Sequence, residues 1–224
     1  RVLGRMCDGI MARTFEHPLV EQLAEHSPGP VINGLTDWSH PCQAMADMMT
    51  VQEWFDANSQ GPPLGGRTLA FVGDGNNVAR SLAVACGKLG LRFVLAAPEG
   101  YELPGEFLGQ LDAMDVPWPC ECTHDAVEAA SRADVIYTDT WTSMGQESEK
   151  QKRLRDFAGF QVNADMLAAA ADHAIVLHCL PAYRGCEITD EAFEAHAATI
   201  LEQAENRLHL QRTLLTLLLG EGGL

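Results

Sequence analysis

The sequence alternates short apolar runs with longer stretches of helical periodicity, and this alternation restricts the chain to few architectures. Thr68–Val72 is typical of a buried strand, Val78–Leu89 of a helix, and Arg92–Ala96 of a second strand. A strand, a helix and a strand in this order form a unit whose two strands lie parallel. Because the connections of parallel strands place helices on the faces of the sheet, the pattern predicts an α/β fold with parallel sheets and flanking helices, doubly wound.

The rest of the chain continues this pattern. Further strands are predicted at Val135–Tyr137, Ala174–Leu177 and Thr199–Leu201, and Val31–Ile32 reads as the end of another. Helices are predicted over residues 42–55, 103–114, 126–133, 149–157, 164–171 and 205–219, and residues 1–6 read as the middle of a helix. The Gly/Pro-rich stretch Gly61–Gly66 is expected to connect two domains. Parallel sheets bind ligands at the carboxyl ends of their strands, so the chemistry is expected there.

The charge of the chain argues against two classes of partner. Fifteen Lys and Arg against 31 Asp and Glu give a formal net charge of -16. Such an acidic surface repels phosphate backbones and anionic lipids, so neither a nucleic acid nor a membrane surface is an expected partner. No apolar run approaches the roughly 20 residues of a transmembrane helix. An anionic substrate would therefore depend on a few local basic residues.

The seven cysteines, an odd number with no signal-peptide pattern ahead of them, favour a reducing, cytoplasmic setting over a disulfide framework. Cys120, Cys122 and His124 could suggest a metal, but no second pair follows at the spacing of a zinc site. We interpret this segment as a turn before a helix, and we expect neither a metal nor a cofactor.

The first strand-to-helix turn, Gly73 to Val78, half matches a dinucleotide-binding fingerprint. Gly73 and Gly75 permit a tight turn and a close ligand approach, but Val78 stands where the fingerprint has its third glycine. Glu99 lies near the position of a ribose-binding acid, which leaves a nicotinamide cofactor open. The alternatives are a ligand carboxylate bound by amides at the helix start, and a purely structural turn.

Polar residues follow the strand that ends near residue 138. Asp139 could anchor an ammonium group, or it could cap a helix. Ser143 and the flexible Gly145 indicate a closing loop.

The next strand exit carries His178, Cys179, Leu180 and Pro181. Adjacent residues of a strand point to opposite faces, which argues against a thiolate–imidazole pair and against Cys179 as a covalent nucleophile. Pro181 ends the strand and leaves the carbonyl oxygen of Leu180 free to accept a hydrogen bond from a ligand.

Two helix starts complete the candidate site. His40 and Gln43 lie three residues apart, where both can reach one small polar group, although His40 could instead be a capping or surface residue. We expect Glu205-Asn206-Arg207 to open the last helix, with an arginine where an acid is expected, and this departure from the local rule indicates function.

Taken together, these motifs resemble the ornithine carbamoyltransferases. The resemblance runs from residue 1 to about residue 219 and is carried by Asp8–Arg13, Asn33–Asp37, His40–Gln43, Phe71–Asn77, Asp139–Glu147, His178–Pro181 and Ala204–Arg207. His-Cys-Leu-Pro together with Ser-Met-Gly is the specific pair, because the aspartate relatives share His-Pro-x-Gln but lack the Ser-Met-Gly loop.

The resemblance implies a carbamoyl phosphate domain and a Rossmann-like ornithine domain, assembled as a homotrimer with active sites at subunit boundaries. Residues 1–52 would be the C-terminal part of the first domain and residues 53–203 the ornithine domain. Residues 204–224 would form a helix that returns to the first domain.

The resemblance also implies the substrates, carbamoyl phosphate and L-ornithine, and a role for each site residue. His40 and Arg13 would polarise the carbamoyl oxygen, Gln43 would bind the carbamoyl amide, and Arg207 would hold carbamoyl phosphate. The residues of the ornithine side would be Asn77 at the α-carboxylate, Asp139 at the α-ammonium, Ser143 and Met144 on the closing loop, and Cys179 with the Leu180 carbonyl beside the δ-amine.

One departure from the family's pattern concerns the phosphate. The family binds it with a Ser-x-Arg-Thr loop, a motif that these 224 residues do not contain. Since the chain also begins at Arg1 within an apparent helix, we expect an upstream segment that this sequence lacks, or a protein that has lost it. The alternatives to ornithine carbamoyltransferase are a non-catalytic or truncated relative, a sister carbamoyltransferase using another amine, and an NAD-dependent dehydrogenase.

Overall fold

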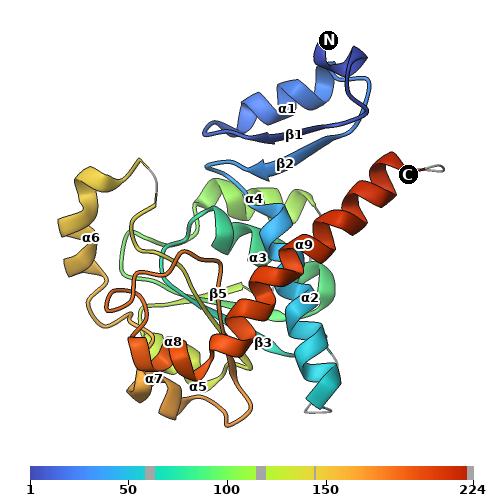
Figure 1. Cartoon of the computed structure of the whole chain (residues 1–224). Coiled ribbons are helices and arrows are strands. Elements are labelled where there is room, and N and C mark those ends of the chain that lie inside the picture. Colours follow the sequence, from blue (N-terminus) through green and yellow to red (C-terminus); the bar gives the residue numbers. More distant parts are fainter. Residues whose placement is uncertain (59–63, 115–119, 144, 221–224) are drawn as a thin grey trace.

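A five-stranded parallel sheet forms the centre of the molecule, with the strand order β5-β4-β3-β6-β7 (Figure 1). The computed structural model describes residues 1–58, 64–114, 120–143 and 145–220. The strands are β3 (Thr68–Val72), β4 (Arg92–Ala96), β5 (Cys120–Thr123), β6 (Val135–Thr138) and β7 (Ile175–His178). The chain moves outward from β3 to β5 and then starts again at β6, on the other side of β3. Ligands of α/β proteins bind at such a reversal, outside the carboxyl ends of the strands.

Helices flank this sheet. The helices that follow its strands are α3 (Asn77–Leu89), α4 (Gly105–Ala113), α5 (Ala126–Ser131), α6 (Lys150–Asp156), α7 (Ala164–Ala169) and α8 (Asp190–Ala195). Short polar side chains begin several of them: Asn76 accepts from two first-turn amides of α3, and Asp125 and Asn163 cap α5 and α7. Gly90 ends α3 in the left-handed conformation that glycine adopts at little cost.

The core lies between the sheet and these helices. Every side chain of β3, β6 and β7 is buried, and Phe71 of β3 stacks on Tyr137 of β6 with ring centroids 5.4 Å apart. Strands buried on both faces have continuous apolar sequences, which is why the sequence locates these three so closely.

A small N-terminal unit lies beyond one end of the main sheet (Figure 1). Its elements are the 3-10 turn η1 (Leu3–Arg5), β1 (Ile10–Arg13), α1 (His17–His26) and β2 (Val31–Leu35), and its two strands pair in parallel. The helix α2 (Pro41–Asn58) leads from this unit to the main sheet. The long α9 (Ala197–Leu219) packs against α2 and β7 and runs back toward the N-terminal unit, where Leu219 lies close to Gly9.

The predicted fold class is confirmed, and most predicted elements lie within a few residues of their expected bounds. The predicted strand Thr199–Leu201 is wrong, because these residues belong to the first turns of α9. Thr199, Ile200, Gln203 and Asn206 are buried at helical spacing, so packing overrides the strand propensity of the Thr-Ile pair. Arg207 therefore lies well inside a helix, and the argument that it opens one does not hold.

Other sequence predictions also need correction. Residues 1–6 contain a single 3-10 turn, Leu3–Arg5, in place of an α-helix. The segment Cys120–Thr123, interpreted as a turn, is the edge strand β5, whose side chains are half-buried or exposed. The sequence reading also missed β1, α1 and α8. Of the predicted connector Gly61–Gly66, residues 61–63 lie outside the described residues.

Candidate functional site

A cleft of about 1280 Å³ opens at the carboxyl ends of the main-sheet strands. Its walls come from the segments after β3, β4, β6 and β7, from the end of β1, from the start of α2 and from α9. Nine of the predicted site residues line it: Arg13, His40, Gln43, Asn77, Asp139, Ser143, Cys179, Leu180 and Arg207. The tenth, Met144, lies outside the described residues.

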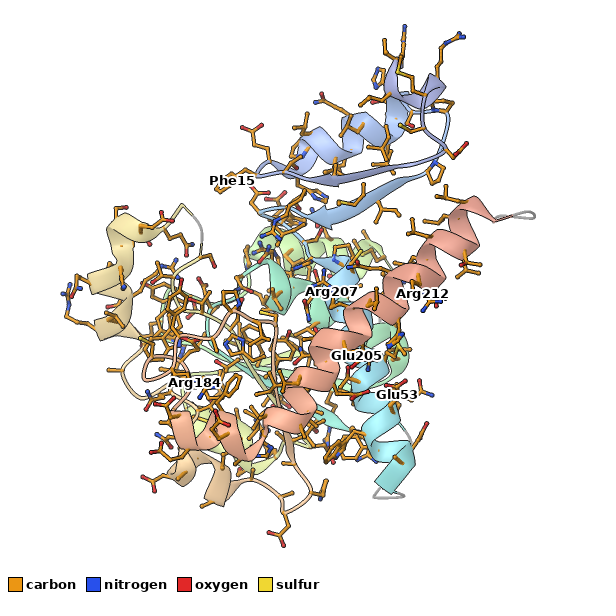
Figure 2. All side chains as sticks on the ribbon, in the orientation of Figure 1. Phe15, Glu53, Arg184, Glu205, Arg207 and Arg212 are labelled. Carbon is orange, nitrogen blue, oxygen red and sulfur yellow. The ribbon has the colours of Figure 1, made fainter. Side chains whose placement is uncertain are left out.

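One wall of the cleft is cationic. Arg13 reaches it from the exposed end of β1, His40 from the residue before α2, and Arg207 from α9 (Figure 2). The Arg207 guanidinium donates a hydrogen bond to the side-chain carbonyl oxygen of Gln43, and this bond links α9 to α2 at the cleft. We call Arg13, His40, Gln43 and Arg207 the cationic wall.

His40 is a neutral member of this wall at physiological pH. Burial, together with the charges of Arg207 and Arg13, lowers the pKa of His40 to about 4. Its backbone N–H donates to the Ser81 hydroxyl, 2.8 Å away, and this bond holds the start of α2 against α3. A neutral imidazole presents one ring N–H and one ring acceptor, so His40 can donate to an oxygen without adding a full charge.

A second wall of the cleft is centred on a carboxylate. Asp139, the residue after β6, accepts hydrogen bonds from the Asn76 amide at 2.8 Å and from the Cys179 thiol at 3.0 Å. Asp139 and Cys179 lie side by side because β6 and β7 pair with Thr138 opposite His178. We call Asp139, Cys179 and Asn76 the acidic wall.

The two residues of the His178-Cys179 pair face different neighbours, as predicted. The imidazole of His178 contacts Glu187 at 3.1 Å, whereas the Cys179 sulfur faces Asp139. Burial and the Asp139 carboxylate raise the pKa of the Cys179 thiol well above its usual range. A cysteine held as a thiol is a poor nucleophile, which agrees with the sequence argument against covalent catalysis.

Leu180 turns the chain into the cleft. Its φ is 58°, a left-handed conformation that is rare for a residue with a bulky side chain, and its peptide bond to Pro181 is cis. The His178 ring accepts the Leu180 N–H at 2.8 Å, and Glu187 accepts the Tyr183 N–H at 2.5 Å. Within the described part of the chain, the Leu180 carbonyl oxygen has no hydrogen-bond donor, so it remains available to a ligand.

The start of α3 supplies donors beside the acidic wall. The Asn76 side chain already accepts the N–H groups of Val78 and Ala79, and Asn77 donates from its side chain to the Thr36 carbonyl at 2.6 Å. Asn77 lines the cleft, and among the described residues its backbone N–H has no acceptor. The close approach at Gly75 serves the chain itself: a Cβ there would lie 2.5 Å from the Glu102 carbonyl oxygen.

The described residues of the loop after β6 line the cleft. The Ser143 N–H donates to the Gln146 side chain, and the Phe15 ring (Figure 2) is close enough to Gly145 that a Cβ there would lie 3.3 Å from it. Arg153 of α6 links this loop to the segment after β3, because it pairs with Asp74 at 2.5 Å and donates to the Trp141 carbonyl at 3.0 Å.

Sequence reasoning missed three polar groups in or next to the site. Asn76 was passed over for Asn77, although an asparagine before a helical run is the usual cap. Glu187 and Asp47 are wholly buried carboxylates, and no local pattern distinguishes them from exposed acids. In the described ranges, no group of three or more His, Cys, Asp or Glu could hold a metal, and no helix is long and apolar enough to cross a membrane.

Comparison with known proteins matches both parts of the chain. Residues 65–218 match the Asp/Orn binding domain of aspartate/ornithine carbamoyltransferase, and residues 1–53 match its carbamoyl-P binding domain. An ornithine carbamoyltransferase of Methanopyrus kandleri is 46% identical over 221 residues, which cover 98% of this chain and 69% of that protein. The chain thus spans about 69% of the length of this relative.

Solved structures agree with the sequence comparison. Ornithine carbamoyltransferase from Pyrococcus furiosus is 46% identical and superimposes with a TM-score of 0.86 over 98% of this chain and 69% of that one. The anabolic enzyme from Campylobacter jejuni gives a TM-score of 0.89 at 38% identity, over 97% and 71% of the two chains. An N-acetyl-L-ornithine transcarbamylase is more distant, at 28% identity and a TM-score of 0.82 over 97% and 70%. Two matched domains and relatives close to half identical along its length show that the chain belongs to the ornithine carbamoyltransferase family.

Proposed function

We propose that this protein transfers the carbamoyl group of carbamoyl phosphate to the δ-amine of L-ornithine, giving citrulline and phosphate. The observation that carries the proposal is the cleft in which a cationic wall and an acidic wall share one space. One substrate is a phosphorylated anion and the other carries an α-ammonium group, so each has a wall of opposite charge.

On the cationic wall, Arg13 and His40 polarise the carbamoyl oxygen and Arg207 holds the phosphate from the side of α9. The neutral state of His40 supports its role as a hydrogen-bond donor to the carbamoyl oxygen. Gln43 binds the carbamoyl amide, since its side-chain orientation is set by Arg207 on one side and Asp47 on the other.

On the acidic wall, Asp139 binds the ornithine α-ammonium and Asn77 binds the α-carboxylate through its side chain and free N–H. Ser143 and Met144 close the loop over the amino-acid head. The Cys179 sulfur and the Leu180 carbonyl oxygen accept hydrogen bonds from the δ-amine and position it in its uncharged, attacking form.

The chemistry needs no covalent enzyme intermediate. The lone pair of the neutral δ-nitrogen attacks the carbamoyl carbon, which becomes tetrahedral and places a negative charge on its oxygen. The carbon–oxygen bond to phosphate then breaks, its electron pair leaves with the phosphate, and the phosphate takes up the proton that the nitrogen loses. The protein contributes orientation and donors aimed at the oxyanion. Removing one such donor typically costs about 3 kcal/mol of barrier lowering.

The proposal extends to the organisation of the protein. Residues 1–52 belong to the carbamoyl phosphate domain, 53–203 form the ornithine domain and 204–224 return to the first. The working form is a cytoplasmic homotrimer, and phosphate binding needs the Ser-x-Arg-Thr loop that these 224 residues lack.

The decisive test compares the 224-residue chain with a form extended at its N-terminus by a segment carrying Ser-x-Arg-Thr. Both are purified free of host enzyme and assayed for citrulline. Phosphate needs several charge-assisted donors, each worth about 1.5–3 kcal/mol, so the short chain should make no measurable citrulline and the extended form should. Robust turnover by the short chain would refute the need for the loop, and inactivity of both would refute the activity.

A comparison of two amines, L-ornithine and N-acetyl-L-ornithine, tests which amine the enzyme uses as its substrate. Asp139 needs a cationic partner, so N-acetyl-L-ornithine, whose α-nitrogen is uncharged, should react far more slowly than ornithine in the active form. Preference for the acetylated amine would identify a sister carbamoyltransferase instead.

A further inference from the structure

A wholly buried carboxylate lies between the two walls, and none of the roles above uses it. Asp47 of α2 accepts three side-chain hydrogen bonds. The Gln43 amide lies 2.7 Å and the Gln203 amide 2.6 Å from one carboxylate oxygen, and the Tyr137 hydroxyl lies 3.0 Å from the other. These donors offset part of the loss of hydration that a buried carboxylate suffers.

The orientation of both amides follows from their other partners. The carbonyl oxygen of Gln203 accepts the backbone N–H of His178 at 2.9 Å, and that of Gln43 accepts from Arg207. Both partners can only donate, so each glutamine must turn its amide nitrogen toward Asp47.

The Tyr137 hydroxyl has one proton, which it donates to Asp47, while its oxygen accepts from Gln203 at 3.2 Å. Tyr137 of β6 pairs with Leu177 of β7, and Cys179 lies two residues beyond Leu177 on the same face, so its sulfur is the alternative acceptor on that side of the ring. A carboxylate is the stronger acceptor, and stacking on Phe71 keeps the ring in place. The Cys179 proton is in turn directed to Asp139.

We propose that Asp47 is a positioning residue that sets hydrogen-bond directions on both walls: it turns the Gln43 carbonyl oxygen toward Arg207, and it draws the Tyr137 proton away from Cys179. Cys179 then remains a thiol directed at Asp139, beside the place of the attacking amine. The consequence for catalysis rests on the proposed function, whereas the hydrogen-bond arrangement is independent of the amine that the site accepts.

The electrostatic surroundings agree with this arrangement. The titratable groups that act on the Cys179 thiol are Asp139, Asp47 and Tyr137, and the first two disfavour a second negative charge there. Burial raises the pKa of Asp47 to about 7, against the three hydrogen-bond donors and the charge of Arg207, so the carboxylate is mostly ionised at pH 8. Cys86 of α3 also lies within the field of Asp47.

The test is the rate at which iodoacetamide alkylates Cys179 at pH 8, followed by mass spectrometry of the peptide that contains it. In Asp47→Asn, the new side chain can accept from both glutamine amides and turn its own NH2 to Tyr137. The Tyr137 proton then faces Cys179 and stabilises its thiolate. Alkylation should accelerate about tenfold, the factor that one pKa unit represents.

A double-mutant cycle isolates the role of Tyr137. Tyr137→Phe alone should change the alkylation rate by less than about twofold, because the wild-type proton points at Asp47. In the Asp47→Asn/Tyr137→Phe variant most of the acceleration should disappear, leaving only the part due to the lost charge. An undiminished acceleration in the double variant would overturn the proposal.

Asp134→Asn is the matched control. Asp134 is a partly buried carboxylate just before β6, at the other end of the strand, where it accepts the Thr68 N–H at 2.8 Å and pairs with Arg67. Its replacement should leave Cys179 alkylation unchanged, and an equal acceleration there would overturn the proposal. If Asp47→Asn does not fold, Tyr137→Phe still tests the proposal. A tenfold slower alkylation of Cys179 in this variant would mean that the Tyr137 hydroxyl donates to Cys179 in the wild type, and it would overturn the proposal.

Kinetics in a form that makes citrulline complete the test. Asp47→Asn should lower kcat more than it changes the KM for ornithine, with a shifted pH profile, while Asp134→Asn keeps both. If no form makes citrulline, the proposed function fails, but the alkylation cycle still decides the role of Asp47.

Discussion

The two walls of the cleft are built in different ways. The acidic wall follows two neighbouring strands, so pairing of Thr138 with His178 brings Asp139 and Cys179 together by register alone. The cationic wall takes Arg13, His40 and Arg207 from three elements that meet only through the packing of α2, α9 and the N-terminal unit. The difference teaches that one half of the site is set by sheet geometry and the other by helix packing.

The ionised residues of the two walls also differ in burial. Asp139 is 8% exposed, with its oxygens occupied by protein donors, whereas Arg13 is exposed and Arg207 half-buried. Because buried, hydrogen-bonded charges cost more to remove than exposed ones, removal of the Asp139 charge should have a larger effect than removal of Arg207.

The largest effect is expected for Asp139→Ala. Loss of a buried charge partner costs about 2–5 kcal/mol, so affinity for ornithine should fall several hundredfold. Norvaline, which has the same amino-acid head but no δ-amine, should weaken by the same factor in isothermal titration. Selective loss of ornithine would mean that Asp139 meets the δ-amine, and the assignment of the acidic wall would be reversed.

The second prediction concerns stability against pH and the neutral state of His40. Its folded-state pKa of about 4 lies below the ordinary histidine value of 6.5, so the unfolded state binds more protons between these values. This site therefore costs the wild type stability as pH falls from 6.5 to 4, by up to about 3 kcal/mol. The variant His40→Asn has no such titrating group. As the pH falls from 6.5 to 4, the free energy of unfolding measured in urea should therefore decrease more in the wild type than in the variant.

The opposite contribution of Asp47 does not disturb this comparison. Its raised pKa makes the folded state bind more protons up to about pH 7, but it does so in both proteins and cancels in the difference. Above pH 7 the difference should be constant. A constant difference from pH 4 to 7 would show that His40 is not held neutral.

Arg207→Gln should weaken carbamoyl phosphate binding about tenfold, the value of one charge-assisted bond at a half-exposed site, in the form that carries the phosphate loop. Affinity for norvaline should be unchanged, because the acidic wall does not contact this residue. Arg212→Gln, on the exposed face of the same helix (Figure 2), is the matched control and should change neither affinity. Equal losses in both variants would indicate a general charge effect of α9.

The smallest effect is expected for Cys179→Ser. A serine hydroxyl can still donate to Asp139, so the citrulline rate of the active form should fall by a modest factor, roughly threefold to tenfold, with an altered KM for ornithine. Mass spectrometry of the wild type during turnover should detect no carbamoyl-cysteine. A trapped adduct would replace the direct transfer with a covalent mechanism.

Much of the fold and of the acidic wall could be predicted from sequence for one physical reason. β3, β6 and β7 are buried on both faces, so their sequences are continuous apolar runs, and the residues that follow them must lie at the ligand-binding edge. β5 and α8 escaped notice because a half-exposed edge strand and a six-residue helix carry little periodic signal.

The sequence by itself determined the α/β architecture, the motifs at the strand exits and the opposite facing of His178 and Cys179, because these depend on local periodicity and strand geometry. Only the tertiary structure decided that α9 begins at Ala197, that Arg207 reaches Gln43, and that Asp47 is buried among donors as distant in sequence as Gln203. The same holds for the lowered pKa of His40, which arises from burial and from two arginines on other elements. Burial and long-range hydrogen bonds are properties of the packed chain, and no local pattern encodes them.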